Sequence, residues 1–192
     1  MSRFLLVSAL EQELDSVEYH YILYTGVGKI NATYKLTHYL SQYSGDTKPD
    51  IVINFGTAGS RNIPLYTLVD CTKFVQRDMD VTELGFRKGE TAFEDYIPFM
   101  LDFSTTNNPI GKNLICGTGD SFVQDIDKEI YSDVFDMESY ALAKVCWQQG
   151  IDFISYKYIT DNADEESANN WKENCSKGVD KFRKILKYYD NN

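Results

Sequence analysis

Short apolar runs alternate with amphipathic stretches along the whole chain, and this alternation restricts its fold more than any other feature. Residues 50–56 (DIVINFG) form the clearest run, of the kind that is buried on both faces of a parallel sheet. Apolar residues at helical spacing predict a helix over 29–43, and a second helix closes the chain. Further strands are expected at 3–9, 19–26, 67–81 (one strand, or two separated by a bend), 113–119 and 153–160.

This order of elements predicts an α/β fold. The expected architecture is a three-layer sandwich in which a central mixed, mostly parallel β-sheet is flanked by helices. No repeat, low-complexity tract or Pro/Gly/Ser linker divides the 192 residues, so we expect a single domain over 1–192.

Three of the expected strands end in glycine clusters, at 25–29 (TGVGK), 55–60 (FGTAGS) and 116–121 (CGTGDS). In open α/β sheets ligands bind at the carboxyl ends of strands, where glycine lets the backbone aim its N–H groups at them. Taken singly, each cluster is explained as well by a tight strand-to-helix turn. The first cluster lacks the third glycine of the dinucleotide fingerprint, and Ile30 stands where a P-loop has Ser or Thr.

Charge and cysteine content exclude several classes of partner. A formal charge of −10 argues against nucleic acid, which requires clustered Lys and Arg. Four widely spaced cysteines and only two histidines, His20 and His38, argue against a metal site and favour small buried thiols. The apolar run at 3–9 is too short for a membrane anchor, so we expect a reduced, cytoplasmic, soluble protein without a membrane partner.

The segment 135–146 (FDMESYALAKVC) enters an apolar helical run through two acids, Asp136 and Glu138. Asp136 is well placed as a helix N-cap, and a carboxylate is also favourable one residue into a helix, where Glu138 stands. One cap explains one acid and does not require the second. The second carboxylate is therefore a candidate for holding a ligand.

The glycine clusters and the acidic helix start belong to a series of motifs that occur in a fixed order along the chain. The sequence resembles the methylthioadenosine/S-adenosylhomocysteine nucleosidase branch of the purine and uridine nucleoside phosphorylase superfamily. The resemblance covers residues 8 to 164 and rests on SALEQEL (8–14), TGVGKINA (25–32), NFGTAGS (54–60), RDMDVTELGF (77–86), GTGDSFV (117–123), DMESYALAKVC (136–146) and YITDNAD (158–164).

The resemblance implies a nucleoside phosphorylase-like domain that hydrolyses the N-glycosidic bond of a 5′-substituted adenine nucleoside, as in methionine salvage. It implies a homodimer that uses neither metal nor cofactor. Asp161 would be the acid that serves the purine N7, and Glu13 the residue that orients or deprotonates the attacking water. Glu138 would hold the ribose hydroxyls. The other implied substrate contacts are Thr57, Ala58, Gly59, Phe122, Val123, Met137 and Lys157, the last standing where the branch usually has an arginine.

The chemistry supports these residue types, although each has an alternative. Cleavage places negative charge on the leaving purine, so an acid is needed at N7. Asp161 could instead form an Asx-turn or cap a helix over 165–175, but Asp164 is the better cap candidate. Glu13 could equally be a solvated acid in a first helical turn, and only the family register favours catalysis. Asp120 could cap a helix from 121 onward.

The identity of the nucleophile separates hydrolases from phosphorylases in this superfamily. The first expected loop carries Glu11 and Glu13, and no arginine precedes Ser60 in the second, where Arg61 follows. Acids would repel phosphate, so water is the expected nucleophile. The other readings are a hydrolase or phosphorylase for a futalosine-like nucleoside or adenosine, and a non-catalytic nucleoside-binding protein. The least favoured is an NAD-binding oxidoreductase.

Three departures from the family pattern leave the preferred 5′-group open. The connection from Ala9 to Gly26 is short, Lys157 replaces an arginine, and Phe86 stands where a tyrosine is common. Leu10, Leu84 and Phe86 are core residues by default, whereas family geometry would place them around the 5′-substituent, some of them across a dimer interface.

Overall fold

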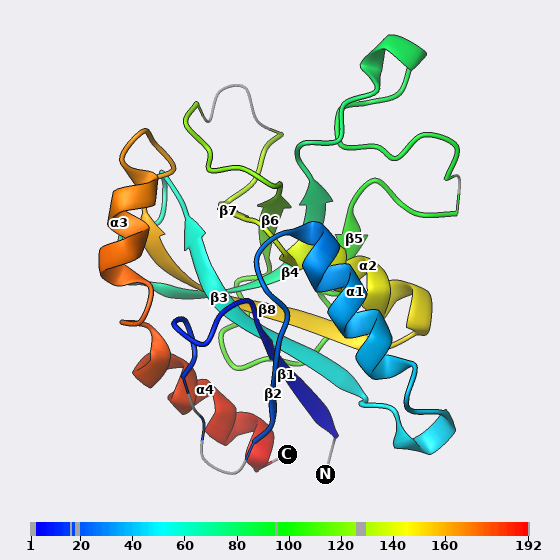
Figure 1. The fold of residues 1–192 in the computed structure, drawn as a ribbon, viewed down its shortest axis with the longest axis vertical. Coiled ribbons are helices and arrows are strands. Elements are labelled where there is room, and N and C mark those ends of the chain that lie inside the picture. Colours follow the sequence, from blue (N-terminus) through cyan, green and yellow to red (C-terminus); the bar gives the residue numbers. More distant parts are fainter. Residues whose placement is uncertain (1–2, 16, 18–19, 95, 126–129, 192) are drawn as a thin grey trace.

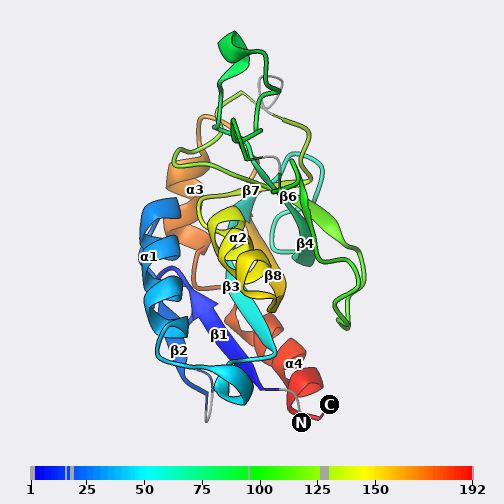
Figure 2. The same ribbon diagram turned by 90° about the vertical axis from the view of Figure 1, so that its right-hand side faces the viewer.

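A twisted mixed sheet forms the centre of the protein (Figures 1 and 2). The computed structural model describes residues 3–15, 17, 20–94, 96–125 and 130–191. In this part of the chain the strands are β1 (Phe4–Ser8), β2 (Ile22–Tyr24), β3 (Ile51–Gly59), β4 (Leu68–Gln76), β5 (Leu101–Asp102), β6 (Leu114–Thr118), β7 (Val134–Asp136) and β8 (Asp152–Asp161).

The strand order β2-β1-β3-β7-β6-β4-β5 is completed by β8, which pairs with both β3 and β4. This double pairing closes β3, β7, β6, β4 and β8 into a ring. Five pairings are parallel, namely β1 with β2 and β3, β3 with β8, and β6 with β4 and β7. The pairings β3–β7, β4–β5 and β4–β8 are antiparallel. The expectation of a mixed, mostly parallel sheet is therefore confirmed.

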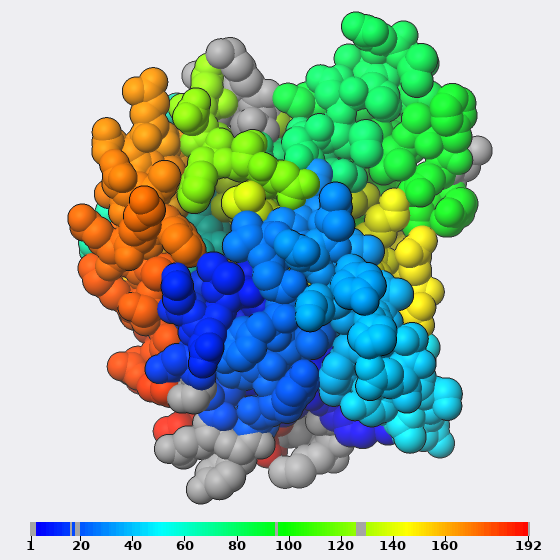
Figure 3. Space-filling view, viewed as in Figure 1, coloured from blue at the N-terminus to red at the C-terminus, as the bar shows by residue number. Residues whose placement is uncertain are grey.

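Helices cover both faces of the sheet, as the three-layer expectation requires. Helices α1 (Lys29–Leu40) and α2 (Ser139–Gln149) lie on one face, and α4 (Val179–Asp190) packs on the other. The shorter α3 (Ser167–Asn174) follows the end of β8. Figure 3 shows α3 (orange), the N-terminal segment (dark blue) and α1 (blue) side by side on one face of the molecule.

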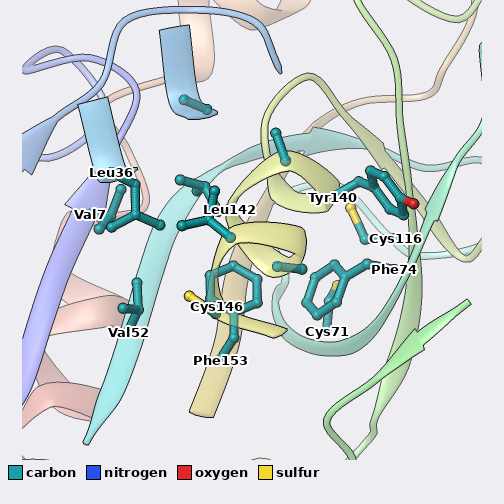
Figure 4. Packing of buried hydrophobic residues seen from close by; sticks show 14 of the residues in the cluster. Val7, Leu36, Val52, Cys71, Phe74, Cys116, Tyr140, Leu142, Cys146 and Phe153 are labelled. Carbon is teal, nitrogen blue, oxygen red and sulfur yellow. The ribbon is translucent and has the colours of Figure 1, made fainter. Parts of the chain in front are cut away.

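Residues that alternate along the central strands pack into two separate hydrophobic cores. Val52 of β3 and Phe153 of β8 pack toward α1 and α2, together with Leu36 and Leu142 (Figure 4). Their neighbours along the strands, such as Ile53, pack toward α4. Because both faces are buried, these strands are apolar on both sides rather than alternating. The buried, free state expected of the thiols is confirmed for Cys71, Cys116, Cys146 and Cys175.

Several boundaries differ from those expected. The segment 67–81 contains one strand, β4, and the strand expected at 19–26 is reduced to β2, with residue 19 outside the described residues. The C-terminal helical region consists of two helices, α3 and α4. No helix begins at 121 within the described residues 121–125; Asp120 instead accepts the backbone N–H of Lys29, so it contacts the start of α1. Across the described ranges, no helix is long and apolar enough to cross a membrane.

Candidate active site

A cavity of about 240 Å³ opens where β3, β7 and β8 end. The glycine loops, the segment after β1 and helix α3 complete its walls, and Figure 3 shows these distant parts of the chain meeting on one face. Every expected site residue except Lys157 lines it: Glu13, Thr57, Ala58, Gly59, Phe122, Val123, Met137, Glu138 and Asp161. The position of these residues at strand ends follows the general rule for α/β sheets.

Glu13 is buried in the cavity wall and is held through one of its two oxygens. Its Oε1 accepts the backbone N–H of Thr57 at 2.9 Å and the Thr57 hydroxyl at 2.6 Å. Its Oε2 is buried and accepts no hydrogen bond from the described residues. A solvated acid on a helix surface is therefore not what the structure contains. The carboxylate is therefore fixed through one oxygen, while the other makes no hydrogen bond with the described residues.

Glu138 is the N-cap residue of α2, but its side chain caps nothing. Its Oε1 instead accepts the backbone N–H of Gly28 across the cavity, at 2.8 Å. Gly28 has φ +91°, a conformation that favours glycine, and so the first glycine cluster turns its N–H toward this carboxylate. Burial raises the pKa of Glu138 to about 8, and the nearby carboxylates of Asp136 and Glu13 add to the increase.

Asp136 binds the start of α2 and a buried lysine. Its Oδ2 accepts the backbone N–H of Ser139 at 2.9 Å and lies 2.8 Å from Lys157 Nζ, while Thr118 donates its hydroxyl to Oδ1. Burial by itself would raise the pKa of Asp136, but Lys157 and these hydrogen bonds outweigh it and lower the pKa to about 2. The sequence-based division, Asp136 for the helix and Glu138 for the cavity, agrees with these contacts, although Glu138 rather than Asp136 occupies the N-cap position.

Lys157 is the expected contact that the structure does not bring to the cavity. Its side chain is buried on β8 and its ammonium is directed at Asp136, behind the wall. A β-carbon added to Gly56 would lie 3.1 Å from Nζ and 3.6 Å from Glu13 Oε1. The ammonium therefore packs against the backbone of Gly56, close to the Glu13 carboxylate. Lys157 therefore lies beneath the described lining of the cavity, paired with Asp136, and its role as a substrate contact stays a prediction.

Asp161 ends β8 and is buried against the second glycine cluster. Its Oδ1 accepts the backbone N–H of Ala163 at 3.1 Å and its Oδ2 accepts the Thr160 hydroxyl at 2.9 Å. A β-carbon at Gly59 would lie 3.1 Å from Asp161 Cγ and closer still to Oδ1, so only glycine fits beside this carboxyl group. Asp161 therefore makes the Asx-type contact to Ala163 and also lines the cavity, so the two alternatives occur together. Asp164, the alternative cap, accepts the N–H of Glu166 just before α3.

The apolar candidates separate into two groups. Leu10 lines the cavity with Phe122, Val123 and Met137. Leu84 does not line it, being 63% exposed in a 3-10 turn (Thr82–Leu84), and neither does Phe86, which packs edge-on against Phe93.

Trp171 is a lining residue that sequence reasoning missed. It extends from α3, and its Nε1–H donates to Thr57 Oγ1 at 2.8 Å. The only signal in the sequence is an aromatic residue within the polar helix SANNWKEN, which does not reveal what the ring contacts.

The cavity is therefore lined by four carboxyl groups. Asp136 is engaged by Lys157 and the start of α2, and Glu13, Glu138 and Asp161 surround a largely apolar space. Such an arrangement can accept hydrogen bonds from hydroxyl groups and exchange a proton with a bound molecule. Within the described ranges, no group of three or more His, Cys, Asp or Glu side chains is placed to hold a metal ion.

Comparisons with known proteins agree on one family. The family model of the phosphorylase superfamily matches residues 16–189. The 5′-methylthioadenosine/S-adenosylhomocysteine nucleosidase of Exiguobacterium sp. is 30% identical over 178 residues, covering 79% of this chain and 71% of that protein. The nucleosidase of Marinomonas sp. is 30% identical over 173 residues, covering 79% and 72%.

Solved structures with the same fold are more distant in sequence. A mutant Helicobacter pylori nucleosidase with 5′-methylthioadenosine in its active site has a TM-score of 0.82 at 18% identity, covering 100% of this chain and 99% of that one. A mutant futalosine hydrolase of H. pylori has a TM-score of 0.81 at 18% identity, covering 97% of each chain.

Proposed function

The chain belongs to the phosphorylase superfamily, in its 5′-methylthioadenosine/S-adenosylhomocysteine nucleosidase branch, and from this membership we propose that it hydrolyses the N-glycosidic bond of an adenine nucleoside. The preferred substrate carries a 5′-substituent, as in methylthioadenosine or S-adenosylhomocysteine. The products are adenine and a ribose derivative. The observation that carries the proposal is the meeting of Glu13, Glu138 and Asp161 on one cavity.

Glu138 is the group that recognises the ribose. The two oxygens of its carboxyl group can form hydrogen bonds with two vicinal hydroxyls at once, and the Gly28 N–H already fixes the orientation of this side chain. Met137 lines the cavity beside it and packs against the sugar.

Asp161 is the group that assists departure of the base. The leaving adenine becomes stable when N7 is protonated, so an acid held beside N7 lowers the barrier. Thr160 and Ala163 hold the carboxyl group through one hydrogen bond each, which fixes its direction. Phe122 and Val123 line the wall where the base would lie, the ring of Phe122 stacking on the purine and the backbone at Val123 reading its edge.

Glu13 positions the nucleophile, and the electrostatics favour water over phosphate. Its Oε2 is a buried acceptor without a partner in the described residues, suited to a water molecule below the sugar. The ionisable side chains lining the cavity are the acids Glu13, Asp136, Glu138 and Asp161, with neither Lys nor Arg among the described lining residues. Such a wall would repel a phosphate anion, which phosphorolysis requires.

The proposal includes a cytoplasmic homodimer, with the second copy covering the start of α1. Ile30 and Tyr34 lie one helical turn apart and are 82% and 65% exposed, beside Val27, which lines the cavity. Apolar side chains exposed together at the edge of a cavity favour an interface between copies. Sedimentation of the purified protein tests this point, and a monomer at micromolar concentration would contradict it.

A substrate panel tests the proposed function. Methylthioadenosine, S-adenosylhomocysteine, adenosine and a futalosine-like nucleoside are incubated separately with the protein, with and without phosphate, and base release is followed by chromatography. We expect base release from the first two without phosphate. Release only with phosphate would identify a phosphorylase, and binding without any release would identify a nucleoside-binding protein.

A further inference from the structure

We propose that Trp171 is a positioning residue that orients Glu13 through the hydroxyl group of Thr57. This inference rests on the proposed function, because Glu13 is the residue there that positions the nucleophile. The three side chains form a line of hydrogen bonds: Trp171 Nε1 to Thr57 Oγ1 at 2.8 Å, and Thr57 Oγ1 to Glu13 Oε1 at 2.6 Å.

The direction of this line follows from the chemistry of its members. An indole N–H can only donate, and a threonine hydroxyl has a single hydrogen. Because Trp171 occupies an acceptor position of Thr57 Oγ1, the hydroxyl hydrogen is left for Glu13 Oε1. A phenylalanine in place of Trp171 would have a ring of similar shape but would leave the hydroxyl free to turn.

The consequence for Glu13 is an unequal use of its two oxygens. Oε1 receives both the N–H and the hydroxyl of Thr57, whereas Oε2 receives nothing from the described residues. The line therefore commits Oε1 to the protein and leaves Oε2, to which the proposed function assigns the nucleophile, without a hydrogen bond from the described residues. Positioning of this kind acts on the rate of the chemical step more than on substrate binding.

Helix α3 places Trp171 for this contact. Asn174, one turn further along the helix, is buried and donates its Nδ2–H to the carbonyl of Thr160 at 2.9 Å. Thr160 also contacts Asp161, so the same strand end anchors the group at the base and the helix that orients Glu13. Helix α3 thereby connects Asp161, the group at the base, with Glu13, the group at the nucleophile.

A first experiment detects the contact without relying on activity. The indole N–H resonances of the wild type are compared with those of Thr57→Val by NMR. We expect the Trp171 resonance to shift and to lose protection from exchange. The other tryptophan, Trp147, is 39% exposed on α2 and serves as the internal reference. A Trp171 indole resonance with unchanged chemical shift and unchanged exchange protection in Thr57→Val would overturn the proposal.

A second experiment measures the effect on turnover of methylthioadenosine. Trp171→Phe should lower kcat by about tenfold, the scale of one misplaced hydrogen bond, and change KM by less than about threefold. Trp147→Phe should change neither. The same Trp171→Phe substitution made in Thr57→Val should cost nothing further, because the line is already broken. Equal losses in the two backgrounds would show that Trp171 does not act through Thr57.

The two experiments also separate this inference from the proposed function. If the wild type shows the N–H contact but releases no adenine from methylthioadenosine or the other nucleosides, the proposed hydrolysis is wrong, and the assignment of Trp171 as a positioning residue for it is overturned as well. If adenine is released but the double variant shows additive losses, only the role of Trp171 is overturned.

Discussion

Lys157 Nζ lies 2.8 Å from Asp136 Oδ2, and both side chains are only 1% exposed. Asp136 lines the cavity and also accepts the first N–H of α2, while Lys157 lies behind it. The pair explains how an acid-lined cavity is tolerated, because one buried positive charge offsets the carboxylates around it. Removing that charge should therefore destabilise the folded protein.

Lys157→Met should lower the free energy of unfolding by about 3–5 kcal/mol, because it leaves the buried Asp136 without its partner. Chemical denaturation measures this loss. Arg3→Met is the matched control, since the Arg3–Asp50 pair is about half exposed and such pairs contribute about 1 kcal/mol or less. The double variant Lys157→Met/Asp136→Asn should recover part of the loss. If the double variant is less stable than Lys157→Met alone, the pair does not act as described.

Stability should fall as pH rises through the range in which Glu138 ionises. Burial raises the pKa of Glu138 from 4.5 to about 8, so the folded protein retains a proton that the unfolded chain has lost. Between these two values the free energy of unfolding therefore decreases with pH, and above about 8 the decrease is complete. Denaturation at a series of pH values should show this slope in the wild type and a weaker one in Glu138→Gln. Equal slopes would assign the proton to another group.

Glu138→Gln should also weaken recognition of the ribose hydroxyls. The wild type should discriminate against 2′-deoxy and 3′-deoxy analogues of methylthioadenosine by roughly tenfold in kcat/KM, since a buried hydrogen-bonding group left unsatisfied costs about 1–3 kcal/mol. In the variant this discrimination should shrink. Competition kinetics with the paired analogues measure it, and unchanged discrimination would assign the sugar hydroxyls to a different residue.

Gly59→Ala should reduce turnover severely. Its β-carbon would lie 3.1 Å from Asp161 Cγ, closer still to Oδ1, and 3.3 Å from the Ala163 nitrogen, so the carboxyl group must move. A displacement of about 1 Å at a reacting group can cost about a hundredfold in rate. Gly111→Ala serves as the control, because that position is exposed, has free space around it and lies outside the residues lining the cavity. The control should lose some stability through its φ of +72° but keep its rate. Normal turnover in Gly59→Ala would contradict the placement of Asp161.

Much of the fold could be predicted from the sequence because its signals are local. The run 50–56 is apolar on both faces, and this alone places β3 at the centre of the sheet. The short β5 and the division of the C-terminal helical region into α3 and α4 carry no comparable signal. Closure of the ring through β8 depends on pairing with β4, from a distant part of the chain, which no local pattern specifies.

A residue of the candidate site could be predicted where its neighbours in the sequence determine whether its side chain points into the cavity. Glu138 follows Asp136 at a helix start, so one acid was available for the cavity. Lys157 lies in the regular part of β8, whereas the pairing of β8 with β3 shifts register just before Asp161, at the end of the strand. Only Asp161 thus reaches the cavity, while Lys157 lies deeper. Trp171 could not be predicted, because its contact with Thr57 depends on how α3 packs.

The most direct measurement of the central claim is adenine release from methylthioadenosine in phosphate-free buffer, for the wild type and Asp161→Asn side by side. We expect release by the wild type at a rate that added phosphate does not increase. In Asp161→Asn we expect a loss of about a hundredfold or more in kcat with nucleoside binding retained, because the amide cannot supply a proton to N7. Wild-type turnover in the variant, or release that requires phosphate, would contradict hydrolysis assisted by Asp161 with water as the nucleophile.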